Sequence, residues 1–260
     1  MVRLVALDLD GTLLDWPGGT IDLTTISILD ELAKQGVLIS IATGRPYLRT
    51  IHPLKVNGLY PGSSYPHYLI CEERDIYELV KGDYAPWGEH NRVAYREEVA
   101  LLPLGNEMIK RLEISQPHLE YSINNGYSQR TRGFVELYFV LEEEALTGFA
   151  ALDEMMADTP LRPIRNGRGI ALRSRSVGKA YCVKELAQHL DIQLSRVMAV
   201  GDSHNDGEML SCGLRPATTN NADPEIKELV RAQGGLVAKR CRSQGVGEIL
   251  TALMEKHLPR

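Results

Sequence analysis

The sequence predicts an α/β protein whose core is a doubly wound parallel sheet, interrupted by an inserted domain of the α+β class. Short apolar segments that end in polar residues occur near both ends of the chain, at residues 4–7, 37–42, 68–71 and 196–200. Segments with helical apolar spacing lie between several of them, and strands that alternate with helices form parallel sheets. Between residues 84 and 177 this alternation lapses.

The composition is that of an ordinary globular protein. Its 260 residues are 43% hydrophobic and 24% charged, and the formal net charge of −5 does not favour a nucleic-acid surface. No apolar run approaches the ~20 residues of a membrane span, and we expect no signal peptide before the first strand. The four cysteines are far apart and lack disulfide or zinc spacing, so we expect free thiols and a cytoplasmic protein.

The first expected strand, residues 4–7, runs directly into Asp8-Leu9-Asp10-Gly11-Thr12. Side chains alternate along a strand, so Asp8 and Asp10 are expected to leave it on the same side. Two neighbouring carboxylates repel each other unless a cation or a proton intervenes. The pair therefore indicates either an ordinary polar strand end or a magnesium site with one carboxylate free to attack phosphorus.

The next elements repeat this pattern. Asp22 is a suitable N-cap for a helix that Gly36 would end, and residues 37–42 form the second expected strand. That strand runs into Thr43-Gly44-Arg45. Thr43 is either an ordinary hydroxyl residue at a strand end or the donor of a hydrogen bond to a phosphate oxygen. Residues 68–71 form the third expected strand.

Residues 84–177 are expected to form the inserted domain, which leaves residues 1–83 and 178–260 to the core. Strands are expected at residues 119–123, 127–131, 134–141, 161–164 and 169–172, with a turn at 124–126. A helix is expected at residues 142–157. Antiparallel strands with a helix on one face indicate an α+β domain.

The parallel pattern resumes with a helix whose first turn contains Lys179. The helix dipole favours anions at that end, so Lys179 is either a surface residue or the neighbour of an anion. The strand expected at 196–200 runs into Gly-Asp-Ser-His-Asn-Asp at 201–206, and strands at 214–217 and 235–238 follow. Helices are expected after Asp223-Pro224 and around residues 246–253. All four polar clusters fall at the carboxyl ends of strands or beside them, where doubly wound sheets bind ligands.

These clusters together resemble the motifs of the haloacid dehalogenase superfamily of phosphotransferases, and most closely its Cof-type branch. DLDGT at 8–12, TGR at 43–45, Lys179 in VGKA, and GDSHND at 201–206 stand in the order of that family. The insertion between the second and third motifs has the position and length of the Cof-type cap. The resemblance implies a haloacid dehalogenase-like core with an α+β cap domain.

The resemblance also implies a role for each motif residue. Asp8 looks like the nucleophile that forms an aspartyl-phosphate, and Asp10 looks like the general acid and base. The residues that resemble the substrate-binding set are Thr43, Gly44, Arg45, Lys179 and Asn205. The residues that resemble the Mg²⁺ site are Asp8, Asp10 (through its backbone carbonyl), Asp202 and, as support for the metal shell, Asp206.

Two segments depart from the Cof-type pattern. Ser203 and His204 stand where that branch usually has small residues, often glycine. Residues 72–75, Glu-Glu-Arg-Asp, replace a turn of the Asn-Gly-Ala type. These changes leave the motif residues intact and bear on the choice of substrate.

The leading expectation is a magnesium-dependent phosphatase acting on a small phosphorylated metabolite such as a sugar phosphate, as a monomer or a small homo-oligomer. A phosphomutase of the phosphomannomutase type shares the cap and the motifs. A nucleotide-sugar transferase would lack the Lys179 and GDSHND pairing, and a non-catalytic phosphoester-binding protein would be expected to have lost Asp8 or Asp10. The cap is expected to set substrate choice through residues of its strands and turn, among them Tyr121, Asn124, Asn125, Tyr127 and Arg130.

Overall fold

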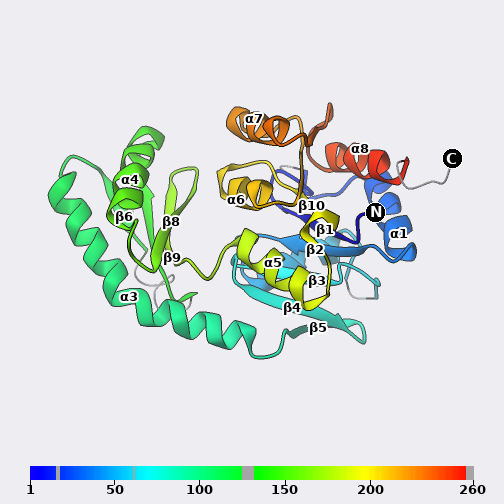
Figure 1. The fold of residues 1–260 in the computed structure, drawn as a ribbon, viewed down its shortest axis with the longest axis horizontal. Helices are drawn as coiled ribbons and strands as arrows, with labels where there is room; N and C mark the ends of the chain where they lie inside the picture. The colour runs from blue at the N-terminus through cyan, green and yellow to red at the C-terminus, as the bar shows by residue number, and fades with distance from the viewer. Residues whose placement is uncertain (16–17, 61, 125–131, 256–260) are drawn as a thin grey trace. The chain divides into compact units, whose positions relative to one another are not determined.

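The computed structural model describes residues 1–15, 18–60, 62–124 and 132–255. The chain forms two compact units (Figure 1). Met1–Gly88 and Lys179–Arg260 make up the first, the core unit, and Glu89–Gly178 make up the second, the inserted unit. No helix in the described ranges combines the length and apolar character needed to cross a membrane.

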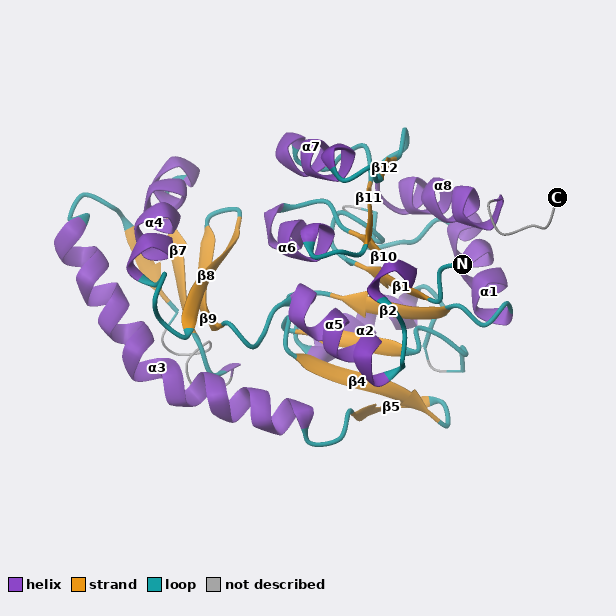
Figure 2. Cartoon of the chain, viewed as in Figure 1, coloured by secondary structure: helices purple, strands orange, loops and turns teal. Residues whose placement is uncertain are grey.

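The core unit is built on an eight-stranded sheet in the order β12-β11-β10-β1-β2-β3-β4-β5 (Figure 2). Its strands are β1 (Leu4–Leu7), β2 (Leu38–Ala42), β3 (Tyr68–Cys71), β4 (Asp75–Val80), β5 (Asp83–Pro86), β10 (Val197–Val200), β11 (Arg215–Thr218) and β12 (Leu236–Val237). The pairings from β12 to β3 are parallel, whereas β4 and β5 add to the edge as an antiparallel hairpin. The prediction of a parallel α/β sheet is confirmed.

Helices cover both faces of this sheet. One set comprises α1 (Leu23–Lys34), α2 (Tyr47–Val56) and α8 (Arg242–Glu255), and the other comprises α5 (Lys179–His189), α6 (Gly207–Ser211) and α7 (Pro224–Ala232). Strand β1 packs against both sets of helices because its side chains alternate between the two faces of the sheet. Val5 and Leu7 pack in the cluster that contains α1, α2 and α8, whereas Leu4 and Ala6 pack in the cluster that contains α5, α6 and α7. Every residue of β1 is therefore buried.

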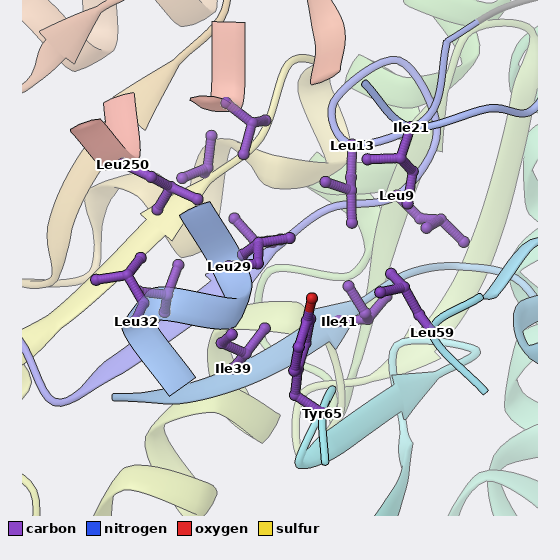
Figure 3. Packing of buried hydrophobic residues seen from close by; sticks show 14 of the residues in the cluster. Leu9, Leu13, Ile21, Leu29, Leu32, Ile39, Ile41, Leu59, Tyr65 and Leu250 are labelled. Carbon is purple, nitrogen blue, oxygen red and sulfur yellow. The ribbon is translucent and has the colours of Figure 1, made fainter. Parts of the chain in front are cut away.

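Figure 3 shows the first of these clusters, in which Leu29 and Leu32 of α1 lie against Ile39 and Ile41 of β2. Helix α1 begins where the sequence predicts it to. The Asp22 carboxylate accepts hydrogen bonds from the N–H groups of Thr24 and Thr25, at 3.0 and 3.2 Å, and so caps two backbone donors that the helix leaves open.

The inserted unit is a four-stranded antiparallel sheet in the order β6-β7-β9-β8 with two helices. Its elements are α3 (His90–Ser115), β6 (Tyr121–Ile123), β7 (Val135–Phe139), α4 (Glu142–Met155), β8 (Leu161–Asn166) and β9 (Gly169–Ser174). Val135, Leu137 and Phe139 point into one buried cluster that both helices share. The strand expected at 127–131, and most of the turn expected at 124–126, lie outside the described residues.

Helix α3 was not anticipated from the sequence. Its buried positions, Ala94, Glu98, Gly105, Met108, Ile109 and Leu112, follow helical spacing. A charged residue and a glycine on this stripe weaken the apolar signal, and Pro103 interrupts it. Glu98 is tolerated inside because Arg173 of β9 donates to both of its carboxylate oxygens, at 2.5 and 3.1 Å.

The hairpin of β4 and β5 and the helix α2 were also missed. The hairpin turns on Lys81 and Gly82, which have φ of 53° and 87°, as two-residue turns between twisted strands require. Lys-Gly is a weaker signal for this turn than Asn-Gly. Helix α2 contains Pro53, a residue that usually ends helices.

Candidate active site

The predicted polar clusters meet because of the strand order. Strands β10, β1 and β2 are adjacent and parallel, so their carboxyl ends lie at one edge of the sheet. Each of the three is followed by a cluster: residues 201–206, 8–12 and 43–45 respectively. The N–H of Asp8 donates to the carbonyl of Val200 at 2.8 Å and continues the β1–β10 ladder one residue into the site.

A buried ammonium group lies between two of the aspartates. Lys179, the first residue of α5, places its Nζ 2.7 Å from Asp8 Oδ1 and 2.6 Å from Asp206 Oδ1. Lys179 is 2% exposed, Asp8 4% and Asp206 0%. The side chain that looked misplaced at a helix N-terminus thus has two anionic partners.

Asp206 and Asp202 are held by the surrounding loops. The second carboxylate oxygen of Asp206 accepts the N–H groups of Asp202 and Ser203, at 3.0 and 3.1 Å. Asp202 accepts the Thr12 hydroxyl at 2.8 Å and the Asn221 amide at 3.4 Å. These bonds leave the two carboxylates little rotational freedom.

Two glycines permit this close packing. Gly11 has a φ of +80°, and a Cβ added to it would lie 2.3 Å from Asp202 Oδ2. A Cβ on Gly201 would lie 2.4 Å from Asp206 Cγ. Both distances are below any contact between real atoms, so a side chain at either position would displace an aspartate of the site.

The electrostatics of the group show an excess of negative charge. Burial raises the pKa of Asp8 well above its ordinary value, and Asp206 and Asp202 add to the effect while Lys179 opposes it. Burial also raises the pKa of Asp202 to about 6, with Asp206 adding to the rise and Thr12 opposing it. Burial alone would lower the pKa of Lys179, but Asp206, Asp8 and Glu73 raise it. The lysine is therefore charged, and its single positive charge acts on the carboxylates of Asp8, Asp202 and Asp206.

The same three carboxylates fit a hard divalent cation. One oxygen from each of Asp8, Asp202 and Asp206 can be chosen so that all three lie within 4.8 Å of one another. Carboxylate oxygens are the ligands that Mg²⁺ and Ca²⁺ prefer, and the group contains no His or Cys that would favour zinc. Burial and, after it, repulsion between the carboxylates raise the pKa values of Asp8 and Asp202, and a cation at this position would offset both effects.

Asp10 lies outside that carboxylate group and has a different partner. Arg45 donates from Nε to Asp10 Oδ2 at 2.6 Å, and its terminal nitrogen donates to the other oxygen. The side chain of Asp10 is 52% exposed and that of Arg45 is 30% exposed, so this ion pair adds little to the free energy of unfolding. It fixes the direction of the Asp10 carboxylate instead. The strand ends at Leu7 and a turn follows, so Asp8 and Asp10 are oriented separately.

The other residues of the expected substrate-binding set, Thr43, Gly44 and Asn205, lie beside Arg45 and Glu73. Thr43 is 1% exposed, and its hydroxyl oxygen accepts the N–H of Arg45 at 3.2 Å. A Cβ on Gly44 would lie 3.7 Å from Glu73 Oε1. Asn205 contacts the same oxygen, donating to it from Nδ2 at 3.0 Å.

A cavity of about 140 Å³ lies beside Asp10 and Arg45 within the core unit. Leu14, Pro53 and Val56 line its apolar part. A cavity of about 150 Å³ is large enough for benzene, so this one has room for a compact organic group.

Three residues that contact the site through hydrogen bonds are not expected from the sequence: Thr12, Glu73 and Asn221. Thr12 belongs to the DLDGT motif, and its hydroxyl donates to Asp202. Asn221 donates to the carbonyl of Gly11 at 2.8 Å as well as to Asp202. Its signal is the polar run Thr-Thr-Asn-Asn at 218–221, which begins at the last residue of the parallel strand β11. Glu73 belongs to residues 72–75, which depart from the family pattern.

Of the five residues expected to act in the cap, the structure describes Tyr121 and Asn124. Tyr121 lies in β6, where its ring packs against Phe139 with a centroid separation of 5.1 Å. Asn124 donates to Glu136 at 3.5 Å. Asn125, Tyr127 and Arg130 lie outside the described residues.

Comparison with known proteins identifies a family for the chain. The family model described as haloacid dehalogenase-like hydrolase matches residues 5–70 and 159–250. HMP-PP phosphatases from Yersinia pseudotuberculosis and Yersinia pestis are 28% identical to the chain over 270 residues. These alignments cover 96% of this chain and 94% of each relative.

Solved structures show the same fold. The sucrose-phosphatase from Synechocystis sp. PCC6803, in complex with sucrose and phosphate, has a TM-score of 0.70 and 19% identity, and the match covers 98% of both chains. A haloacid dehalogenase-like hydrolase from B. subtilis has a TM-score of 0.67 and 18% identity, and the match covers 97% of this chain and 100% of that one.

Proposed function

Because the chain belongs to the haloacid dehalogenase-like hydrolases, we propose that it is a magnesium-dependent phosphatase that hydrolyses a small phosphate monoester, such as a sugar phosphate. The observation that carries the proposal is the buried group in which Lys179 joins Asp8 and Asp206 beside Asp202. Relatives named HMP-PP phosphatase support a phosphorylated metabolite as substrate. The cavity beside Asp10 supports a compact leaving group.

In the first step, an Asp8 carboxylate oxygen attacks phosphorus and the bond between phosphorus and the ester oxygen breaks. In this step Asp10 is protonated and keeps only one of its two bonds to Arg45, which directs the carboxyl group. Its other oxygen donates the proton to the departing alkoxide, so the alcohol leaves neutral. Thr43 and Lys179 stabilise the charge on the phosphoryl oxygens in the transition state.

In the second step, water attacks the phosphorus of the aspartyl-phosphate and the bond to Asp8 breaks. Asp10, now a carboxylate, takes the proton of the water, so inorganic phosphate is released and both aspartates return to their starting forms. A bound Mg²⁺ would supply positive charge against the negative phosphoryl group and Asp8. We also propose that the inserted unit is the cap and selects the leaving group.

Incubation of the purified protein with Mg²⁺ and a panel of phosphate esters tests the proposal, with released phosphate as the readout. We expect free phosphate from at least one sugar phosphate without any bisphosphate activator. The Asp8→Asn protein, prepared in parallel, controls for contaminating phosphatases. Isomerised sugar phosphate that forms only with a bisphosphate activator would instead identify a phosphomutase.

Activity is expected to depend strictly on Mg²⁺ and to be inhibited by Ca²⁺. Asp8, Asp202 and Asp206 supply the hard oxygen ligands that both ions prefer. Ca²⁺ accepts about six to eight ligands in a loose geometry, so it would engage both oxygens of Asp8 and leave no nucleophile. Phosphate release is measured after chelation and after re-addition of each ion. Full activity in excess chelator would contradict the metal requirement.

A further inference from the structure

The two departures from the family pattern meet at one side chain, Asn205. Its Oδ1 accepts a hydrogen bond from the Ser203 hydroxyl at 2.6 Å. Its Nδ2 donates to Glu73 Oε1 at 3.0 Å. Ser203 lies two residues from Asn205 in the chain, whereas Glu73 lies 132 residues away and follows β3. Both ends of the Asn205 amide are therefore held.

Glu73 is itself fixed against the loop that carries Thr43. It is 6% exposed, and its N–H donates to the carbonyl of Thr43 at 3.0 Å. The N–H of Glu72 donates to the carbonyl of Arg45 at 2.9 Å. Glu72 and Glu73 have φ of 52° and 55°, a conformation that non-glycine residues adopt only where surrounding contacts require it. The Glu73 carboxylate thus has a defined position beside Gly44.

The chemistry of Glu73 and Ser203 selects one orientation of the Asn205 amide. A carboxylate only accepts hydrogen bonds, so Glu73 must face the NH₂ group of the amide. The Ser203 hydroxyl then donates to the amide oxygen. The opposite orientation would place the amide oxygen against the Glu73 carboxylate. The second N–H of Nδ2 has no partner among the residues that the structure describes, and it remains available to an anion.

We propose that Glu73 and Ser203 are positioning residues that hold the Asn205 amide with an N–H ready to bind the phosphate of the substrate. This inference rests on the proposed function. The two residues act through Asn205, so their loss is expected to weaken phosphate binding while the Asp8 and Asp10 chemistry continues.

Glu73 also carries a negative charge near the phosphate site, and loss of that charge alone would favour anion binding. The isosteric variant Glu73→Gln separates the two effects, because it removes the charge and keeps an oxygen that can accept from Asn205. Glu73→Ala removes both. If positioning dominates, Glu73→Ala binds phosphate more weakly than Glu73→Gln does.

The test uses the full chain with Mg²⁺ and two readouts: KM and kcat for the best phosphate ester, and the Kd of inorganic phosphate by calorimetry. For Glu73→Ala we expect KM and Kd to rise about 10-fold, as loss of one hydrogen bond to a charged group predicts, with kcat within about 2-fold. Glu73→Gln is expected to stay within about 3-fold of wild type in both. Ser203→Ala is expected to raise KM and Kd in the same direction as Glu73→Ala.

A double-mutant cycle tests whether Glu73 affects phosphate binding through Asn205. Asn205→Ala is expected to raise KM and Kd at least as much as Glu73→Ala, and the double variant is expected to be no worse than Asn205→Ala alone. Additive losses would overturn the proposal, because Glu73 would then act independently of Asn205. Equal KM and Kd values for Glu73→Ala and Glu73→Gln would also overturn the proposal.

Glu72→Ala is the matched control for local unfolding. Glu72 has the same 6% exposure and a similar φ, but its carboxylate accepts from Arg74 at 3.2 Å. The control is expected to lower the thermal midpoint and leave Kd for phosphate unchanged. Calorimetry needs no turnover, so wild type that binds phosphate but hydrolyses no ester would refute the phosphatase and leave the positioning of Asn205 standing. Wild type that does neither would refute both.

Discussion

Asp8→Asn is expected to abolish turnover, with a fall in kcat of at least about 1,000-fold. An amide is a poor nucleophile, so the step in which the aspartyl-phosphate forms has no attacking group. A 1,000-fold loss corresponds to about 4 kcal/mol of transition-state stabilisation, at about 1.4 kcal/mol per tenfold in rate. Asp8 is 4% exposed and accepts from Lys179 at 2.7 Å, so no neighbouring water is expected to replace it efficiently.

The folded state of the Asp8→Asn protein is expected to be at least as stable as wild type in metal-free buffer. Asp8, Asp202 and Asp206 repel one another and share one ammonium group, and the substitution removes one of the three charges. A thermal unfolding curve alongside the phosphate-release assay therefore separates lost chemistry from lost structure. A kcat within 10-fold of wild type would contradict the assignment of Asp8 as the nucleophile.

Much of this site was predictable because strand order places it. Asp8, Thr43 and Asp202 each follow a strand of a parallel sheet, and β10, β1 and β2 are neighbours, so residues far apart in sequence meet at one edge. Lys179 was detectable because a cation is unfavourable at a helix N-terminus unless an anion is near. Both inferences depend on the regular geometry of strands and helices.

The contacts of irregular segments were not predictable. The pairing of Asp10 with Arg45 depends on a turn that begins after Leu7, which strand alternation does not describe. The bond from Asn205 to Glu73 depends on two residues with positive φ that are not glycine, and the sequence shows no signal for that backbone. Helix α3 was missed because Glu98 and Gly105 occupy buried positions that periodicity expects to be apolar.

Lys179→Met is expected to impair both stability and catalysis. Lys179 is 2% exposed and donates to Asp8 at 2.7 Å and to Asp206 at 2.6 Å, so its removal leaves carboxylates buried without their cation. Loss of one partner from a buried ion pair costs about 3–5 kcal/mol, and the free energy of unfolding of metal-free protein is expected to fall by that amount. The loss of a charged donor to the phosphoryl oxygens is expected to lower kcat by about 100- to 1,000-fold.

The two effects of Lys179→Met should respond differently to Mg²⁺. A cation bound by Asp8, Asp202 and Asp206 offsets the repulsion among them, so saturating Mg²⁺ is expected to restore much of the lost stability. It is not expected to restore kcat, because the donor to the phosphoryl group is still missing. Chemical denaturation with and without Mg²⁺, together with single-turnover assays, measures both, and Lys179→Arg serves as the variant that keeps the charge. If metal-free Lys179→Met were as stable as wild type, the buried ammonium would not be what balances these aspartates.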